Sequence, residues 1–288
     1  MDVNDNQIGR RLREVRSWRQ LSQTAVAGLA GITPAYLSMI EQGKRPVTKR
    51  STLEALASAL QIAPAELAGA SHTPSEPIDA EAQAGLLSLE GALELFELGD
   101  DPGVPVRAWP EIVADVEHLT ALTHVRSDYA AQGRLAPKLI AELHAVYVRH
   151  PQQRHDVLRA LIRCYDAAMW TTKRLGGRGL PLLAARLAAR CAEELDAPAW
   201  RGFAAWLRGD AAGPLSRSQQ YHRAVRTADE LVPHLDDADV LQSYGILHLS
   251  AALASAAQSD RDTAAVHLAE AQDAADRLES EVGSFAGM

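Results

Sequence analysis

The sequence of 288 residues predicts an all-α protein with two unlike domains. Apolar residues recur at the spacing of amphipathic helices along most of the chain, and no segment shows the alternation expected of a strand. Cap residues, glycine and proline divide the first 70 residues into short helices. These short helices are followed at residues 69–79 by GASHTPSEPID, a segment rich in proline and serine. We predict that this segment is a linker between the two domains.

The run Leu21–Pro46 predicts two short helices joined by a tight turn. Ser22 is a typical N-cap for the first helix, and Gly31 is typical of its end. Thr33, followed by proline, is a typical start for the second helix, and Gly43 stands where a helix takes a left-handed C′ residue. Two helices in this order form a helix-turn-helix, whose second helix can lie in the DNA major groove.

The second helix of this pair has one apolar and one exposed face. Leu37 and Ile40 share a face and are expected in the core. The opposite face carries Pro34, Ala35, Ser38, Met39 and Gln42, which form the candidate reading surface. Lys44 and Arg45 follow the helix, where positive charge suits both a helix C-terminus and a phosphate.

Flanking segments extend the pair into a domain of five short helices. Ile8, Leu12 and Val15 form an apolar stripe on a preceding helix. The other faces of that helix carry Arg10, Arg11, Arg13, Arg16 and Arg19, which suit either a solvated face or DNA contacts. A fourth amphipathic helix is expected around residues 53–60, and a short fifth one at Ala63–Leu67.

This order of signals resembles the XRE family, the Cro and phage-repressor regulators, over Ile8–Leu67. The resemblance rests on IGRRLREVRSWRQLSQTAVAGLAGITPAYLSMIEQGKRP and on LEALASALQIAPAEL. It implies that the chain binds double-stranded DNA. It also implies an ion pair between Arg16 at the end of the first helix and a buried Glu41, which is expected to fix the orientation of the recognition helix.

The resemblance assigns DNA contacts position by position. Phosphate or minor-groove contacts fall on Gln23, Thr33, Lys44, Lys49 and Arg50. The base-reading positions are Pro34, Ala35, Ser38 and Met39, with Tyr36 and Arg45 able to reach a base edge or the backbone. Family members that carry glutamine or arginine at the base-reading positions differ from this chain. Here thymine methyl groups suit Ala35 and Met39, and Ser38 can bond either base type.

Charge and composition separate the two domains. Residues 1–70 hold nine Lys or Arg against six Asp or Glu, a net charge of +3, which leaves −11 for the rest of the chain. Only the N-terminal part therefore suits a polyanion. Cys164 and Cys191 lack CxxC spacing, and we find neither a signal peptide nor an apolar run of 18 residues. We expect a reduced, cytoplasmic protein without a membrane partner.

The acidic region beyond the linker predicts consecutive helices joined by short breaks. We expect helices at 80–98, 110–131, 137–149, 152–175, 181–195, 199–208, 215–232, 238–258 and 261–279. Recurring alanines suit close packing between antiparallel pairs. The region resembles the tetratricopeptide-like domains attached to XRE-family regulators. The ending EVGSFAGM, without a paired helix, suggests truncation or capping by a partner.

In such regulators the helical domain receives a signal, often a peptide, and commonly dimerises. This implies a homodimer with a peptide or small-molecule effector. A candidate pocket combines aromatic and cationic side chains, namely Tyr165, Trp170, Arg174, Trp200, Phe203, Trp206 and Arg208. The alternative is that the aromatic residues belong to the packed core.

The sequence carries no motif of a catalytic, metal or cofactor site. The histidines His144, His150 and His155 are not spaced to share a helix face, and no phosphate-binding loop or nucleophile motif occurs. We therefore expect a homodimeric DNA-binding transcriptional regulator that is not an enzyme and needs no cofactor. The alternative is a regulator of the antitoxin or anti-activator type, whose helical domain binds a partner protein.

Overall fold

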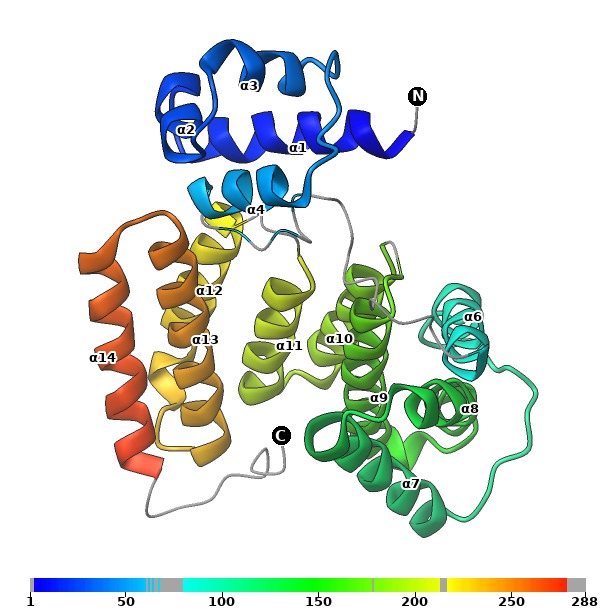
Figure 1. The fold of residues 1–288 in the computed structure, drawn as a ribbon. Helices are drawn as coiled ribbons and strands as arrows, with labels where there is room; N and C mark the ends of the chain where they lie inside the picture. Colours follow the sequence, from blue (N-terminus) through cyan, green and yellow to red (C-terminus); the bar gives the residue numbers. More distant parts are fainter. Residues whose placement is uncertain are drawn as a thin grey trace. The chain divides into compact units, whose positions relative to one another are not determined.

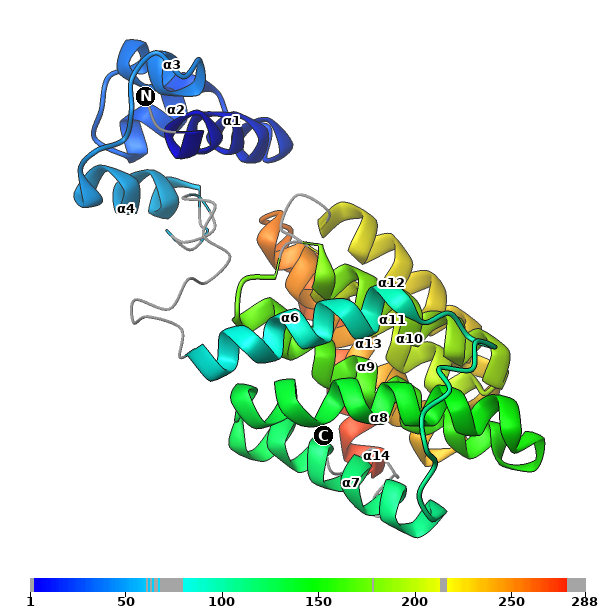
Figure 2. The ribbon, with the colours of Figure 1, turned by 90° about the vertical axis from the view of Figure 1, so that its right-hand side faces the viewer.

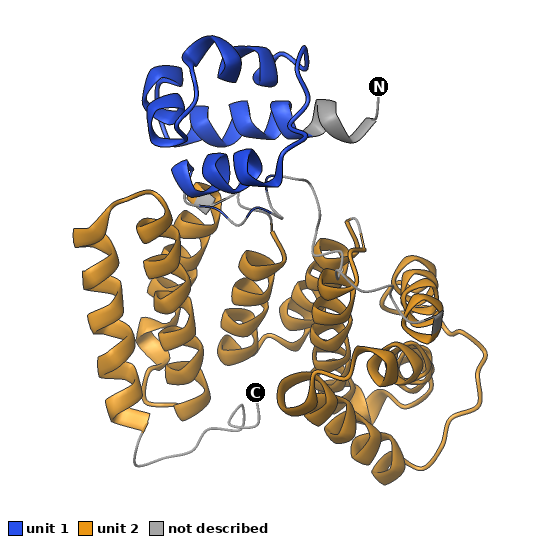
Figure 3. Ribbon diagram, in the orientation of Figure 1, with its two compact units in different colours: residues 1–73 blue, residues 74–288 orange. Residues whose placement is uncertain are grey.

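The computed structural model of the protein describes residues 3–60, 80–177, 179–212 and 217–278, together with Ile62, Pro64 and Leu67. Within these residues every regular element is a helix, which confirms the expected all-α class. The chain divides into two compact units, Met1–Thr73 and Pro74–Met288 (Figure 3). The expected linker and the sequence EVGSFAGM lie outside the described residues.

Unit 1 is a small domain of short helices around one hydrophobic core. Its helices are α1 (Val3–Trp18), α2 (Gln23–Leu29), α3 (Pro34–Glu41) and α4 (Arg50–Ala59) (Figure 1). The core takes at least one residue from each of them, including Leu12, Val26, Leu37 and Leu56. The helix expected at Ala63–Leu67 falls largely outside the described residues, although the Leu67 side chain is fully buried.

Side-chain caps and glycines set the ends of α2 and α3 where the sequence predicts them. The Ser22 and Thr33 hydroxyls accept hydrogen bonds from backbone N–H groups of α2 and α3, at 3.0 and 3.2 Å. Gly31 and Gly43 follow these helices with φ of +66° and +70°. Because only glycine takes this conformation without steric cost, the two glycines fix the turns on both sides of α3.

The first helix crosses the third at backbone contact, through Gly9. A Cβ atom built on this glycine would overlap the carbonyl oxygen of Ile40 and lie 3.4 Å from the Cα of Glu41. Hydrogen is thus the only side chain that this crossing admits. The contact sets how closely α1 approaches the helix of the candidate reading surface.

Unit 2 is an array of helix pairs (Figures 1 and 2). Its elements are α6 (Ala80–Leu95), α7 (Trp109–Ala121), η1 (Leu122–Arg126), α8 (Tyr129–Arg149), η2 (Pro151–Gln153), α9 (Arg154–Arg174), α10 (Leu180–Leu195), α11 (Pro198–Ala211), α12 (Arg217–Leu231), η4 (Val232–His234), α13 (Ala238–Ala257) and α14 (Arg261–Leu278). From α7 onward each α-helix packs on the next, and α6 also packs on α8, α7 on α9 and α11 on α13. Such stacking of consecutive helices confirms the expected helical array and is consistent with a tetratricopeptide-like architecture.

The helix boundaries differ from the prediction between residues 110 and 137. The single helix expected at 110–131 is divided, because α7 passes into the π-helical turn η1 and Ser127 takes a left-handed φ of +52°. The Asp128 carboxylate then accepts a hydrogen bond from the Ala131 N–H at 2.9 Å and starts α8. Pro137, expected to begin a helix, therefore lies inside α8. Capping by Asp128 outweighs the start signal of the proline.

Helix α13 is the one described helix that is long and apolar enough to cross a membrane, with a mean hydropathy of 1.2 over 18 residues. Within the unit, 56% of that window is buried, and α11, α12 and α14 pack against the helix. Burial between three neighbours is the behaviour of a core helix in a stacked array.

Candidate DNA-binding surface

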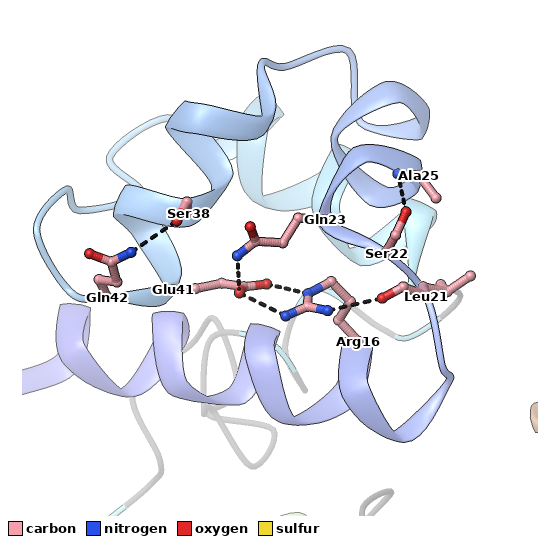
Figure 4. A network of polar contacts seen from close by, with 8 residues as sticks. All are labelled: Arg16, Leu21, Ser22, Gln23, Ala25, Ser38, Glu41 and Gln42. Carbon is pink, nitrogen blue, oxygen red and sulfur yellow. Dashed lines mark hydrogen bonds and ion pairs between the residues drawn. The ribbon is translucent and has the colours of Figure 1, made fainter.

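A buried ion pair ties the end of α1 to the last residue of α3 (Figure 4). Arg16 donates from Nε to Glu41 Oε1 at 2.6 Å and from Nη2 to Glu41 Oε2 at 3.0 Å. Its third nitrogen, Nη1, donates to the Leu21 carbonyl oxygen at 2.9 Å. The Glu41 side chain is 2% exposed and that of Arg16 is 15% exposed. The hydrogen bond to Glu41 raises the pKa of Arg16, so the guanidinium stays charged.

Gln23 extends this pair into a network that joins three helices. Its Nε2 donates to Glu41 Oε2 at 2.8 Å (Figure 4). The resemblance placed Gln23 at a DNA phosphate, and the structure gives its amide an internal partner as well. The carboxylate of Glu41 thus holds α1, α2 and α3 in one relative orientation. This network, rather than α3 alone, positions the candidate reading surface.

The candidate reading surface on α3 is presented as the helical pattern predicts. Pro34, Ala35 and Met39 are exposed and Ser38 is half-buried, while the Leu37 and Ile40 side chains are buried beneath them. Tyr36 is half-buried and packs against the core of unit 1. The exposed part of α3 is therefore largely apolar, as the sequence suggested for thymine contacts.

Gln42 adds a polar group to this surface. Its Nε2 donates to Ser38 Oγ at 2.9 Å, and both residues are accessible at the end of α3 (Figure 4). The helical pattern predicts Gln42 on this face, but the resemblance does not assign it a base contact. Ser38 and Gln42 stand one helical turn apart, and this spacing is the signal that could have paired them. The pair leaves the amide oxygen and one N–H of Gln42 available.

Exposed cations follow α3 and reach the start of α4. Lys44, Arg45, Lys49 and Arg50 are all exposed. Lys49 is the N-cap residue of α4 and makes no side-chain capping bond. Arg50 pairs with Glu54 at 2.8 Å, but the two side chains are 90% and 49% exposed. Solvent-exposed pairs of this kind contribute little, so Arg50 can exchange Glu54 for a phosphate.

The structure separates the residues of the expected effector pocket. Tyr165 and Phe203 are fully buried and Trp200 is nearly so, and all three belong to the core of unit 2. The Tyr165 hydroxyl lies 2.9 Å from His144 Nε2. These three are therefore corrected to core residues, because the faces of α9 and α11 that carry them pack inside the array.

The other pocket residues lie nearer the surface. Trp170 is half-buried with the Lys173 ammonium 4.9 Å and the Arg174 guanidinium 5.7 Å from its ring centroid. Trp206 and Arg208 on α11 are also half-buried. The set divides into a buried aromatic part and a peripheral part of two tryptophans and two arginines, and only the second can meet a ligand from solvent.

Unit 2 contains two buried cysteine thiols, and its described residues form no metal-binding group. In the described residues no group of three His, Cys, Asp or Glu side chains is placed to hold a metal ion. Cys164 and Cys191 are buried free thiols. Burial raises the pKa of both thiols, that of Cys191 to about 12, so neither is a thiolate at neutral pH.

Comparisons with known proteins identify the class of unit 1. Residues 7–69 match the family model described as "Helix-turn-helix domain". The "Uncharacterized HTH-type transcriptional regulator RghRB" of Bacillus subtilis (strain 168) is 39% identical over 72 residues, which are 24% of this chain and 51% of that protein. The "HTH-type transcriptional repressor RghR" of the same organism is 43% identical over 55 residues, 19% of this chain and 41% of the relative. The match thus spans about half the length of these relatives or less.

Among solved structures, ComR from S. thermophilus, in complex with DNA and its signalling peptide ComS, aligns over 96% of this chain and 95% of its own. The identity is 14% and the TM-score 0.27, values too low to establish a common arrangement. The fold of unit 1 and the matched family model therefore define a helix-turn-helix domain at residues 7–69. More particularly, part of the chain is similar to two HTH-type regulators of Bacillus subtilis.

Proposed function

We propose that this chain is a homodimeric, sequence-specific DNA-binding transcriptional regulator whose α3 lies in the major groove. The observation that supports this most is the exposed face of α3, held against α1 and α2 by the Arg16–Glu41–Gln23 network. The cations from Lys44 to Arg50 flank this face. Phosphate contacts by these cations set the register, and the groups on α3 read the bases.

Base readout in this proposal depends on two kinds of contact. Ala35 and Met39 present apolar groups that suit thymine methyls. Gln42, with its amide oxygen and one N–H available, has the donor and acceptor pair that recognises adenine. We therefore propose that the half-site is rich in A·T pairs.

Replacing Lys49 with alanine is expected to weaken binding to every DNA sequence by a similar factor, because a phosphate contact carries no sequence information. The slope of log affinity against log salt should fall by about one unit. Fluorescence anisotropy of the full chain with an operator duplex and a random duplex measures both effects. Arg201→Ala, an exposed arginine of unit 2, is the control and should change neither.

The salt dependence of DNA affinity in the wild-type chain is the reference for this test. With about six phosphate contacts in a dimer, affinity should fall on the order of a thousandfold between about 50 and 200 mM salt. A salt response that stays flat would rule out phosphate-led docking. A loss in Lys49→Ala that is confined to the operator would instead assign Lys49 to base or groove readout.

We propose that unit 2 supplies dimerisation and binds an effector. Leu249 and Leu253 stand one turn apart on α13 and are 51% and 66% exposed, an apolar face that a second copy would cover. Leu253→Glu is expected to shift the chain from dimer to monomer without loss of helical content. Sedimentation equilibrium with circular dichroism measures both. A wild-type chain that is monomeric at micromolar concentration would contradict the dimer.

A further inference from the structure

Four arginines from three consecutive helices of unit 2 form an electrostatic group, because three of them repel the fourth, Arg223. They are Arg186 on α10, Arg208 on α11, and Arg223 and Arg226 on α12. Helix α11 packs on both α10 and α12 (Figure 1). Arg186 and Arg208 are nearly equidistant from the turn between α10 and α11, so antiparallel packing places them at one level. Arg223 and Arg226 stand three residues apart and share a face of α12. We call these four residues the arginine cluster.

The arginine cluster differs from its neighbours in its ion pairing. In the described part of the chain no carboxylate forms an ion pair with any of its four members. Other arginines of the same helices are paired, Arg190 of α10 with Glu97 at 3.6 Å and Arg201 of α11 with Asp196 at 3.3 Å. Asp210, two residues after Arg208, is occupied by the Lys173 ammonium at 2.6 Å.

Burial makes the missing partner costly for Arg208 and Arg223, whereas Arg186 and Arg226 are exposed. The Nε atom of Arg208 is buried and has no hydrogen-bond partner, and Arg223 is half-buried. The pKa of Arg223 lies below its usual range, first because burial disfavours the charged guanidinium and then because Arg208, Arg226 and Arg186 repel it. A region with a net charge of −11 has carboxylates in excess, yet none of its described carboxylates forms an ion pair with this group. Unrelieved repulsion of this kind is typical of sites kept for function.

We propose that the arginine cluster binds an oxyanion, the carboxylate or phosphate group of the effector, and so anchors that ligand on α10, α11 and α12. Guanidinium groups bind planar oxyanions through paired N–H donors and remain charged when partly buried. The anion would satisfy the Nε of Arg208 and offset the repulsion at Arg223. This inference rests on effector binding by unit 2 in the proposed function, and it does not require DNA binding by unit 1.

Calorimetric titration of the full chain with pyrophosphate and with citrate, in the absence of DNA, tests the site. We expect saturable binding of at least one of the two anions. Arg208→Gln should weaken that binding at least tenfold. Arg201→Gln removes an exposed arginine of the same helix outside the cluster and should bind as the wild type does. Tighter binding of pyrophosphate assigns a phosphate ligand, and tighter binding of citrate assigns a carboxylate ligand such as an acidic peptide.

A second readout does not depend on the choice of anion. Arg223→Gln should raise the melting temperature of the anion-free chain, because it removes a half-buried charge that its neighbours repel. Absence of binding by both anions in the wild type, or an equal loss in Arg208→Gln and Arg201→Gln, would overturn the proposal. Loss of DNA affinity in Arg208→Gln equal to that in Lys49→Ala would instead make the cluster a DNA contact. DNA affinity is measured in a separate titration, so that failure of anion binding by unit 2 can be distinguished from failure of DNA binding by unit 1.

Discussion

Replacing Gly9 with alanine is expected to destabilise unit 1 by about 3 kcal/mol or more, because the new methyl group would overlap the backbone carbonyl of Ile40. A backbone atom cannot swing away as a flexible side chain can, so α1 must shift relative to α3. Hydrogen exchange of the full chain measures the effect, since peptides from residues 8–41 report the opening of unit 1 alone. The affinity for DNA should fall together with the stability of unit 1, because α1 supports α3.

Gly28→Ala is the matched control for this substitution. Gly28 also lies in a helix of unit 1, but a Cβ built on it meets no atom within 4 Å. Alanine there should stabilise α2 by about 0.5–1 kcal/mol, because glycine is a poor helix former. Equal protection in Gly9→Ala and the wild type would mean that α1 and α3 do not cross at backbone contact.

Replacing Arg16 with methionine is expected to cost unit 1 about 3–5 kcal/mol, because the carboxylate of Glu41 would remain buried without its cation. Methionine keeps most of the packed volume, so the loss reports charge and hydrogen bonding. Arg10→Met is the control on the same helix. Its partner Glu14 lies 3.7 Å away and the two side chains are 72% and 42% exposed, so the change should stay within about 0.5 kcal/mol.

The double variant Arg16→Met with Glu41→Met tests what the pair is for. Removing both charges should restore most of the stability that Arg16→Met loses, since no buried charge remains. DNA affinity should stay reduced, because Gln23 and Leu21 lose the partners that orient α2 and α3. Full recovery of DNA binding in the double variant would show that the network contributes stability only.

Local signals made unit 1 predictable from its sequence. Ser22 and Thr33 cap helices through bonds that span three residues, and Gly31 and Gly43 end helices through their own backbone angles. Such features depend on neighbours in the chain. Gly9 has no local signal, because its role comes from Ile40 on another helix. It could be recognised only once α1 and α3 were placed together.

The helix boundaries and buried faces of unit 2 are harder to predict from the sequence, because they depend on contacts between segments that are distant in the chain. The division of the helix at 110–131 depends on Asp128 and a π-helical turn, which apolar spacing does not reveal. Composition suggested an aromatic pocket, but it does not say which face of α9 or α11 is buried. Arg208 was among the expected ligand residues, whereas Arg223 and Arg186 join it only through the stacking of α10, α11 and α12.

Selection of bound duplexes from a random DNA pool by the full chain tests the central proposal most directly. We predict enrichment of an inverted repeat with A·T-rich half-sites centred about one helical turn apart, as expected for a dimer with one α3 in each major groove. Gln42→Ala should lose preference at one adenine position in each half-site and keep the spacing. Retention of DNA without any enriched sequence, or enrichment of the same sequence by a chain lacking residues 1–73, would contradict readout by α3.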